Sequence, residues 1–512
     1  MKNDSDSLSS LVSISSLALK ARKLNIDTRK HFVAAIHSDC ALCRSAGFRS
    51  EARVNIQNGA HPIIATLYVT RNPAISPGEI GLSDSAWEKL GVHEGDKLIV
   101  TLAETLDSFA LVRAKLHGKT LSDVDYKSIM NDMVEGRYSD IQLAAFITAF
   151  VDLNKAETTS LTKAMSESGR QLKWPQYPIV DKHCVGGVPG NRTTMILVPI
   201  IAAHGLTIPK TSSRAITSPS GTADTMGVIT PVDLTIEEMR HVVENEGGCI
   251  IWGGSVDLSP ADDVLVQIER ALDLDSQSQL IASVLSKKLA AGSTHVLIDI
   301  PIGPTAKVRY RNEADVLKSL FLEVGQDIGL NIQIVETDGT QPIGRGIGPV
   351  LEARDVLSVL RNEHDAPQDL KDHSLFLAGT ILESCGGIPL GKGIVEAQKI
   401  LSDGRALKKF EAICKAQGGF REPILASYKH IITSIQRGVI SSIDNRLISR
   451  IAKLAGAPDA PAAGIDLHVS LNESVEKGQP LFTIYAESPG ELNYALHYFH
   501  SHQQVIVIGD AS

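Results

Sequence analysis

Residues 181–194 read DKHCVGGVPGNRTT, and a second loop at 212–227 reads SSRAITSPSGTADTMG. Each loop follows a short apolar or β-branched run, and the first leads into the apolar stretch TMILVPIIAAHG at 194–205, which predicts a buried helix. Glycines let backbone N–H groups approach an anion closely, and a helix N-terminus adds a positive dipole. One such loop alone is equally well explained by a tight turn with an ordinary helix cap. Two of them, with Lys182 and Arg192 beside the first, favour a phosphate site.

Strand-like and helix-like segments alternate around these loops. Four short runs rich in apolar and β-branched residues predict strands: 177–183, 206–212, 295–303 and 330–338. Residues 276–291 have helical periodicity, and Ser276 followed three residues later by Gln279 is typical of a helix N-terminus. Strands that alternate with helices predict a parallel α/β sheet.

The remaining segments predict additional domains. Residues 466–487 are similar to the hammerhead fold of biotinyl and lipoyl carriers, without a lysine in the hairpin turn that could be modified. Short β-like runs, a stretch of helical periodicity and a mixed C-terminal pattern divide the rest of the chain. We therefore predict an α/β multi-domain fold in five segments: a disordered N-terminus at 1–15, a small β-rich N-terminal domain at 16–118, an all-helical domain at 119–175 with parts of 255–292, a larger α/β phosphate-binding domain with a mostly parallel sheet at 176–254 and 293–430, and a C-terminal α+β hammerhead-like domain at 431–512.

Composition and charge exclude several functional classes. The 512 residues are 43% hydrophobic and 21% charged, which is ordinary for a globular protein of about three or four domains. The net charge of −9 and the aromatic content of 4% argue against a nucleic-acid partner. The sequence contains neither an apolar run of about 20 residues nor an apolar N-terminal core, so we expect no membrane partner and no secretion, and we predict a cytoplasmic protein.

The six cysteines are scattered and do not form a disulfide framework. Cys40 and Cys43 make a lone C-x-x-C motif with His37 nearby, and the sequence around them lacks a second pair of ligands. We therefore predict no metal site.

The two loops and three further motifs, in the same order, resemble the thymidine phosphorylase family. QLIASVLSKKLAAGSTHVLIDIP at 279–301 and TDGTQPIGRGIGPVLEARDVL at 337–357 match the family, and residues 121–146 match it more loosely. The resemblance covers about residues 80–490 and is strongest to the long members with an extra N-terminal domain, a group that includes AMP phosphorylases. It implies phosphorolysis of an N-glycosidic bond without a cofactor, a site in a cleft between a helical and an α/β domain, and a homodimer or larger homo-oligomer.

The resemblance places phosphate at the two glycine loops. The implied phosphate-binding residues are one cation, two glycines and four residues with a hydroxyl or thiol group: Lys182, Cys184, Gly186, Gly187, Thr194, Ser212 and Thr222. Such donors suit an oxyanion. The family usually has serine at the position of Cys184, and a thiol is the weaker donor. Cys184 as a covalent nucleophile is the alternative, but phosphorolysis needs none because phosphate itself attacks.

Three residues are implied to face the base. His183 matches a family histidine, and its neutral imidazole could donate a hydrogen bond to the leaving base. A histidine that bonds to backbone at a strand end is the alternative. Ser283 and Lys287 are four residues apart and therefore share one helix face. Lys288 points about 100° away from Lys287 and is expected to be solvated.

One departure from the thymidine phosphorylases bears on the substrate. They carry an arginine that contacts the pyrimidine 15 residues before the serine that matches Ser283, and this chain has Ile268 there. AMP phosphorylases share the departure, and in them the position of Asp275 is implied to be the catalytic acid, although Asp275 also lies where a helix N-cap belongs. The same subgroup implies nucleotide contacts at Ser213, Arg214, Ala215, Ile216, Thr217 and Ser218, and an approach of Lys307 to a 5′-phosphate.

Four functions stay open at this point, all with small-molecule partners. The family reaction converts thymidine and phosphate to thymine and 2-deoxyribose 1-phosphate. The Ile268 departure favours a nucleoside 5′-monophosphate such as AMP, which would give a base and ribose 1,5-bisphosphate. A phosphoribosyltransferase of the same architecture would need acidic residues to hold a metal–pyrophosphate, and the helix predicted at 276–291 has no acidic pair. The fourth is a non-catalytic nucleotide-binding module.

Overall fold

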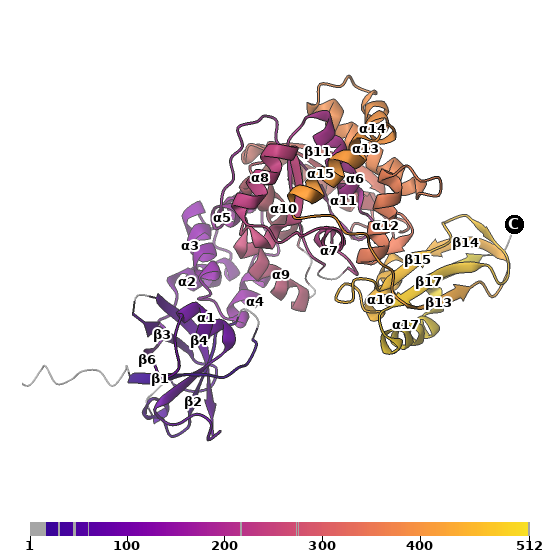
Figure 1. The fold of residues 1–512 in the computed structure, drawn as a ribbon. Coiled ribbons are helices and arrows are strands. Elements are labelled where there is room, and N and C mark those ends of the chain that lie inside the picture. Colours follow the sequence, from indigo (N-terminus) through magenta and orange to yellow (C-terminus); the bar gives the residue numbers. More distant parts are fainter. Residues whose placement is uncertain are drawn as a thin grey trace, which may run out of the picture. The chain divides into compact units, whose positions relative to one another are not determined.

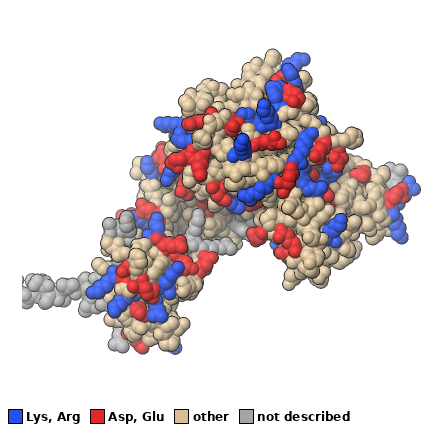
Figure 2. All heavy atoms as spheres, in the orientation of Figure 1, with Lys and Arg blue, Asp and Glu red and all other residues tan. Residues whose placement is uncertain are grey.

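The computed structural model describes residues 17–28, 31–44, 48–59, 61–215, 218–272, 274 and 276–509 (Figure 1). The chain divides into two compact units, Met1–Phe150 and Val151–Ser512. The segment predicted to be disordered, 1–15, lies outside the described residues, as do Ile216, Thr217 and Asp275. None of the described helices is long and apolar enough to cross a bilayer. Figure 2 shows basic and acidic side chains interspersed over the face that it draws.

The first unit begins with a closed barrel of six strands. They are β1 (Leu17–Lys23), β2 (Val33–His37), β3 (Arg53–Asn58), β4 (His61–Thr70), β5 (Glu79–Leu82) and β6 (Lys97–Leu102), in the order β1-β5-β2-β4-β3-β6 around the barrel. Successive residues of a strand point to opposite faces. In β2 and β3 the inward positions are therefore apolar, and Ala34, Ile36, Val54 and Ile56 are fully buried in one core. A 3-10 helix, η1 (Ala41–Arg44), and helix α1 (Asp84–Leu90) lie in the connections.

Three helices complete the first unit: α2 (Asp107–Leu116), α3 (Asp123–Val134) and α4 (Asp140–Ala149). Helices α3 and α4 each begin with a capping box, at Ser122 and Ser139, in which side chain and backbone satisfy each other's hydrogen bonds. Buried aromatic rings join the two helices, because Phe150 stacks on Phe146 and meets the ring of Tyr126 edge-on. The helical periodicity of this stretch is thus confirmed.

The second unit opens with helix α5 (Lys155–Glu167), against which helix α10 (Gln277–Ala290) packs. Ser276 is the N-cap of α10, as predicted, and it accepts a hydrogen bond from the backbone of Gln279. Its hydroxyl also donates to the carbonyl of Val151 at 2.6 Å, which fixes the start of α10 beside the start of α5. Helix α9 (Pro260–Leu272) precedes α10 in the chain.

Five parallel strands form the sheet of the second unit. They are β7 (Val180–Cys184), β8 (Ile208–Ser212), β9 (Gly248–Trp252), β10 (His295–Ile302) and β11 (Asn331–Asp338). They pair in the orders β11-β10-β7 and β8-β9, and a bridge between Ile179 and Thr207 connects β7 to β8. Every pair is parallel, which confirms the predicted α/β pattern. Each predicted strand overlaps an observed one, with first residues that differ by up to three positions and last residues by at most one.

Helices surround this sheet: α6 (Thr193–His204), α7 (Thr222–Gly227), α8 (Ile236–Glu246), α11 (Arg311–Asp327), α12 (Pro349–Leu360), α13 (Gln368–Cys385), α14 (Gly393–Ser402) and α15 (Arg405–Ala416). Helix α6 is buried from its first residue to Ala202, as its uniformly apolar sequence predicted. A 3-10 turn, η2 (Gly253–Ser255), follows β9. The largest core of the unit lies between α6, α12, α13, α14 and α15.

The C-terminal part contains two antiparallel sheets. One has the order β12-β15-β17-β13, with β12 (Gly346–Ile347), β13 (Tyr428–Thr433), β15 (Gly464–Leu467) and β17 (Pro480–Ala486). The other has the order β16-β14-β18, with β14 (Gly438–Ile443), β16 (Ser474–Val475) and β18 (Ile506–Gly509). Helices α16 (Asn445–Leu454) and α17 (Pro489–Ser501) and the turn η3 (Gln503–Val505) complete it. The domain boundaries and the hammerhead likeness stay predictions.

Candidate active site

The strand order changes direction between β7 and β10, and we call the region outside the carboxyl ends of these two strands the crevice. The chain runs from β7 to β8 and β9 on one side of the sheet and then returns to β10 and β11 on the other side of β7. Parallel sheets bind ligands outside the carboxyl ends of their strands, where the chain changes direction in this way. Cys184 ends β7 and lies in register with Asp299 of β10. The first glycine loop leaves β7 at this point.

Lys182 is held in the crevice by a buried carboxylate. Its Nζ lies 3.5 Å from Asp299 Oδ2 and donates to Thr193 Oγ1 at 2.9 Å. Thr337 donates to the other oxygen of Asp299 at 2.6 Å. Burial raises the pKa of Asp299, but Lys182, His373 and Thr337 outweigh burial and hold that pKa below its usual range. Asp299 is therefore a carboxylate and balances the charge of Lys182.

The first loop needs its glycines to adopt this shape. Gly186 and Gly187 have φ values of 102° and 88°, a region that favours glycine. A Cβ on Gly187 would overlap the backbone nitrogen of Lys307, so the loop and Lys307 are in close contact. Asn191 links the loop together, because it donates to Cys184 Sγ at 3.5 Å and accepts from Thr193 at 3.0 Å. The glycines thus bring the backbone of the first loop next to the backbone of Lys307.

Two of the predicted phosphate residues have a different environment from the one expected. Thr194 follows the threonine that contacts Lys182, so Thr193 is the hydroxyl next to the cation. Thr193 and Thr194 are adjacent in the sequence, and only their directions around helix α6 decide which of them contacts Lys182. Burial and the neighbouring Asp299 raise the pKa of Cys184 to about 12. Its thiol is therefore neutral, which disfavours a covalent nucleophile at this position.

The second loop is folded around one carboxylate. Asp224 of α7 accepts hydrogen bonds from the backbone nitrogens of Ala215 at 2.6 Å and Gly221 at 2.8 Å. A Cβ on Gly221 would come within 2.5 Å of the carbonyl of Ser213. These contacts bring Ser213 and Ala215 next to the start of α7, whose first residue is Thr222.

Among the residues of the second loop, Ser212 carries an open donor. Its hydroxyl oxygen is buried at the end of β8 and has no hydrogen-bond partner within the described chain. A buried polar group without a partner costs free energy. The hydroxyl is therefore available to an oxyanion in the crevice. Ser218, in contrast, donates to the carbonyl of Ser220 at 3.0 Å.

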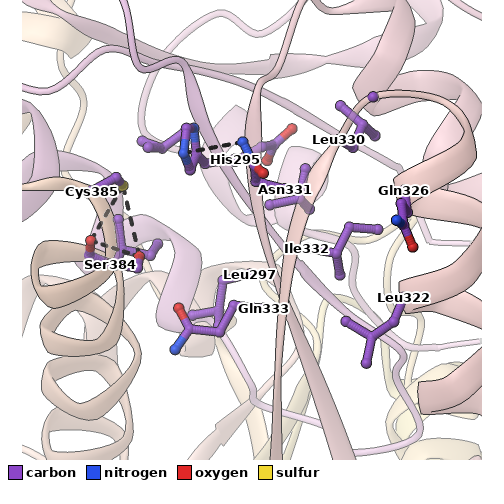
Figure 3. Close-up of a pocket in the computed structure, with 15 residues that line it drawn as sticks. His295, Leu297, Leu322, Gln326, Leu330, Asn331, Ile332, Gln333, Ser384 and Cys385 are labelled. Atoms are coloured by element: carbon purple, nitrogen blue, oxygen red, sulfur yellow. Dashed lines mark hydrogen bonds between the residues drawn. The ribbon is translucent and has the colours of Figure 1, made fainter.

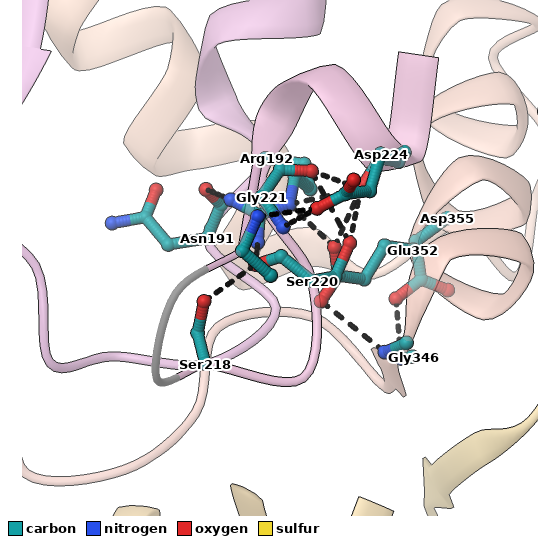
Figure 4. A network of polar contacts seen from close by, with 12 residues as sticks. Asn191, Arg192, Ser218, Ser220, Gly221, Asp224, Gly346, Glu352 and Asp355 are labelled. Carbon is teal, nitrogen blue, oxygen red and sulfur yellow. Dashed lines mark hydrogen bonds and ion pairs between the residues drawn. The ribbon is translucent and has the colours of Figure 1, made fainter. Parts of the chain in front are cut away.

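A buried ion pair connects the two loops (Figure 4). Arg192, at the end of the first loop, donates through Nε to Glu352 of α12 and through Nη2 to the carbonyl of Ser220 at 2.5 Å. Thr225 of α7 donates to the same Glu352 oxygen at 2.8 Å. Glu352 is 1% exposed. Because one guanidinium bonds to groups from both sides, it fixes the spacing between the loops.

His183 is a neutral imidazole surrounded by lysines. Burial lowers the pKa of His183 well below its usual range, and the charges of Lys288, Lys210, Lys287 and Lys182 lower it further. The ring is therefore uncharged at neutral pH and able to donate one hydrogen bond. The charges of these lysines also make the surroundings of the ring positive.

The expectation that Lys288 is solvated is wrong. Its side chain is 3% exposed, and its Nζ lies 2.8 Å from Asp181 Oδ2. Helix α10 is covered on more than one face, and its buried residues include Ser278, Leu285 and Lys288. Helical periodicity identifies which residues share a face, but it does not tell how many faces neighbouring elements cover.

Ser283 and Lys287 lie together as their spacing predicted. Lys287 Nζ donates to Ser283 Oγ at 3.4 Å and forms an ion pair of 2.5 Å with Asp262 of α9. Burial lowers the pKa of Lys287, but Asp262 outweighs burial and raises it. The lysine is therefore charged. Asp262 was not predicted, although its place in the first turn of a helix close in sequence to the motif could have indicated it.

The environments of two residues implied to bind a 5′-phosphate differ. Arg214 makes two hydrogen bonds to Asp233, of 3.0 and 2.8 Å, and its guanidinium lies 4.9 Å from the centre of the Trp252 ring. The charge of Arg214 is thus already paired with Asp233. Lys307 lies against the first loop through its backbone. Asp275, Ile216 and Thr217 lie outside the described residues, so their roles stay predictions.

A separate cavity lies at the other end of the sheet. It has a volume of about 650 Å³ and is lined at the amino ends of β10 and β11 by residues such as His295, Asn331 and Gln333. Figure 3 shows Gln326 on one side of β11 and Cys385 on the other. None of the predicted phosphate or substrate residues lines it. Because parallel sheets bind ligands at their carboxyl ends, we assign the active site to the crevice instead.

The described residues contain no group of three or more His, Cys, Asp or Glu side chains placed to hold a metal ion. In the barrel, Cys40 is buried, and Cys43 donates through its thiol to the carbonyl of His37 at 3.4 Å. Burial, with Cys40 and Asp39, raises the pKa of the Cys43 thiol, which keeps it protonated.

Comparison with known proteins identifies the family of the chain. Residues 176–407 match the α/β domain of a glycosyl transferase family, residues 110–169 match its helical bundle domain, and residues 439–505 match the C-terminal domain of pyrimidine nucleoside phosphorylases. A protein of Polaromonas sp. named "Putative thymidine phosphorylase" is 53% identical over 504 residues, which cover 98% of this chain and 99% of that protein. The chain belongs to the thymidine phosphorylase family.

Two further comparisons give another member of the family and a solved structure with a similar fold. A Legionella pneumophila (strain Corby) family member with the same printed name is 52% identical over 496 residues, 96% of each chain. The crystal structure of anthranilate phosphoribosyltransferase from Thermus thermophilus covers 60% of this chain and 98% of its own, with a TM-score of 0.51 and 19% identity. This thymidine phosphorylase family member therefore combines a helical bundle domain with the α/β domain of a glycosyl transferase family, and its fold is similar to that of the anthranilate phosphoribosyltransferase.

Proposed function

We propose that this protein cleaves the N-glycosidic bond of a nucleoside or nucleotide with inorganic phosphate. The observation that carries the proposal is the buried Lys182, followed in the chain by the neutral His183 and the first glycine loop, at the carboxyl end of β7. A phosphorylase needs an anion held as nucleophile and a hydrogen-bond donor for the leaving base. The lysine charge suits the first task, and the neutral imidazole of His183 suits the second.

In this mechanism phosphate lies at the first loop. Lys182 and the backbone groups of Gly186 and Gly187 orient it, and the Ser212 hydroxyl, which lacks a partner within the described chain, donates to one of its oxygens. Phosphate oxygen attacks C1′ of the sugar as the bond to the base stretches. Positive charge that develops at C1′ is then next to the bound dianion, which stabilises the transition state. The products are a free base and a sugar 1-phosphate.

The base lies on the side of α10. Ser283 and Lys287 contact it, and His183 donates a hydrogen bond as the base leaves. Asp275 supplies a proton if the base is a purine. The reaction needs no cofactor or metal, because the positioned lysines provide the positive charge. We also propose that the active form is at least a homodimer, which light scattering on a sizing column tests.

The primary candidate reaction is thymidine phosphorolysis, and the second is phosphorolysis of a 5′-monophosphate such as AMP. Ile268 in place of a base-binding arginine favours the second. The backbone contact between Lys307 and the first loop also supports it, because this contact places the residue next to the proposed phosphate site. A phosphoribosyltransferase is the more remote candidate, since the anthranilate phosphoribosyltransferase from Thermus thermophilus shares only the fold with this chain.

A substrate panel distinguishes these candidates. Release of free base is measured in phosphate buffer without added metal, from thymidine, uridine, adenosine, AMP, CMP and UMP. Cleavage of thymidine or uridine alone assigns a pyrimidine nucleoside phosphorylase. Cleavage of monophosphates alone assigns a nucleotide phosphorylase. Activity that needs magnesium and pyrophosphate in place of phosphate would contradict both.

Lys307→Ala separates the two phosphorylases further. If the substrate is a 5′-monophosphate, kcat/KM for the monophosphate is expected to fall about 100-fold, because a charge-assisted contact is lost, while kcat/KM for the matching nucleoside changes little. The ratio of the two values is the measurement. Equal losses on both substrates would argue against a contact with the 5′-phosphate. Lys477→Met, on an exposed lysine, is the matched control.

A further inference from the structure

Lys210, Lys288 and Asp181 form a second cluster of charged side chains. Lys210 of β8 and Lys288 of α10 share one carboxylate, Asp181 of β7. The Nζ atoms lie 3.4 and 2.8 Å from the two oxygens of Asp181. All three residues are at most 5% exposed. Two buried ammonium groups on one carboxylate leave a positive charge that the cluster does not balance.

Counting the ion pairs around His183 identifies the unmatched lysine. Lys182 has Asp299, Lys287 has Asp262, and Lys288 has Asp181 at the shorter distance. Lys210 has only the shared carboxylate and the carbonyl of Thr211, to which its Nζ donates at 2.5 Å. The four lysines thus have three directly paired carboxylates. Lys210 is the member whose charge lacks a counterion of its own.

The other groups that face Lys210 do not supply that counterion. Cys249 of β9 donates through its thiol to the carbonyl of Lys210 at 3.9 Å, and burial and Asp181 raise the pKa of this thiol, so it is neutral. His183 is neutral as well. Lys288 repels Lys210. Asp181 is therefore the one anion that faces Lys210 among the described residues.

The missing anion is the ligand of the neighbouring loop. Lys210 lies two residues before Ser212 on the same strand, which corresponds to a rise of about 7 Å. At that distance an anion and a buried ammonium group still interact strongly, because little water lies between them to screen their charges. We propose that Lys210 is a positioning residue that takes up a proton from solvent when an anion binds at the phosphate loops. This inference rests on the proposed function, since it assumes that the loops hold phosphate.

The direction of the linkage follows from the charges. Burial, followed by the repulsion of Lys288, lowers the pKa of Lys210 to about 7, although Asp181 opposes the shift. A bound anion favours the ammonium form and raises this pKa. Below about pH 6, Lys210 is protonated in both states, so anion binding moves no proton. Between this pKa and the raised pKa of the bound state, Lys210 is neutral in the free protein and protonated in the bound one, so binding takes up close to one proton. Anion affinity therefore falls as the pH rises from the pKa of the free state to that of the bound state.

Calorimetry with sulfate tests the proposal. Sulfate is the probe because it keeps two charges throughout the neutral range, whereas phosphate itself titrates. Binding to the full-length protein is measured at pH 6 and pH 8.5 in buffers of different ionisation enthalpy, which gives the number of protons taken up. The wild-type protein is expected to take up about one proton at pH 8.5 and almost none at pH 6. Displacement by phosphate and loss of binding in Lys182→Ala place the sulfate at the loops.

Two substitutions of Lys210 assign the proton. Lys210→Arg keeps a charge that does not titrate, so it is expected to abolish proton uptake while affinity stays within about threefold of the value at pH 6. Lys210→Met leaves Asp181 and Lys288 as a simple pair, so the fold is retained; it is expected to abolish uptake and lower affinity about tenfold. Lys477→Met, on an exposed lysine, is expected to change neither quantity.

The outcomes distinguish this inference from the proposed function. Sulfate binding without proton uptake, or equal uptake in wild type and Lys210→Arg, would overturn the role of Lys210 and leave phosphorolysis intact. Proton-linked binding in a protein that cleaves no nucleoside or nucleotide would support Lys210 and contradict the proposed function. Absence of both sulfate and phosphate binding would overturn the two together.

Discussion

Replacing Lys182 with alanine is expected to lower turnover by about a thousandfold or more, with a rise in the KM for phosphate. The lysine is the cation at the carboxyl end of β7 that orients the attacking phosphate, and electrostatic positioning supplies most of the rate in such a reaction. The change also leaves Asp299 buried without its lysine, with only His373 and the Thr337 hydroxyl beside it. Breaking a buried ion pair in this way costs about 3–5 kcal/mol of the free energy of unfolding. Steady-state kinetics with phosphate as the varied substrate measure the first effect.

A double variant separates the two effects of this substitution. Lys182→Ala combined with Asp299→Asn removes both charges, so the buried carboxylate no longer opposes folding. It is expected to recover most of the stability lost in Lys182→Ala, as measured by chemical denaturation, and none of the activity. An unchanged phosphate KM in the well-folded double variant would remove Lys182 from the phosphate site.

Replacing Arg192 with alanine is expected to have the second largest effect. The guanidinium bonds to Glu352 and to the carbonyl of Ser220, and its loss leaves Glu352 buried with only the Thr225 hydroxyl and the Gly348 nitrogen as donors. We expect a loss of about 3–5 kcal/mol in the free energy of unfolding and a rise of at least about tenfold in the phosphate KM, because the two loops lose their common anchor. Denaturation and phosphate saturation curves measure the two effects.

Arg192→Lys and the pair Arg192→Met with Glu352→Gln are the controls. Lysine keeps the charge but has no planar fork, so it should restore stability in part without restoring the phosphate KM. The double variant should restore stability and leave the loops unanchored. If Arg192→Ala kept both its stability and its phosphate KM, the ion pair would have no part in holding the loops.

The sequence predicted the parts of the site that depend on local pattern. Apolar runs located β7, β8, β10 and β11, and a uniformly apolar stretch located α6. The glycines of the first loop predicted a tight backbone conformation, and their observed φ values are ones that favour glycine. The common location of Ser283 and Lys287 followed from helical spacing. These inferences needed no knowledge of which elements pack together.

The charged partners could not be predicted from local pattern, because they come from distant elements. Asp299, Asp262 and Glu352 each approach a cation from another part of the chain. An isolated acid inside an apolar strand, as in LIDIP, is a signal that could have indicated such a partner, because charged residues are rarely buried unpaired. The burial of Lys288 was missed for the same reason: it depends on how α10 is covered, not on its sequence.

Phosphorus NMR of the reaction mixture tests the central claim most directly. The protein is incubated with inorganic phosphate and the substrate that the panel selects, without added metal, and the spectrum is followed over time. The account predicts that inorganic phosphate is consumed and a sugar 1-phosphate signal grows in step with free base. Release of base with no consumption of phosphate would identify a hydrolase, and release of base that requires magnesium and pyrophosphate would identify a phosphoribosyltransferase; either result would contradict phosphorolysis.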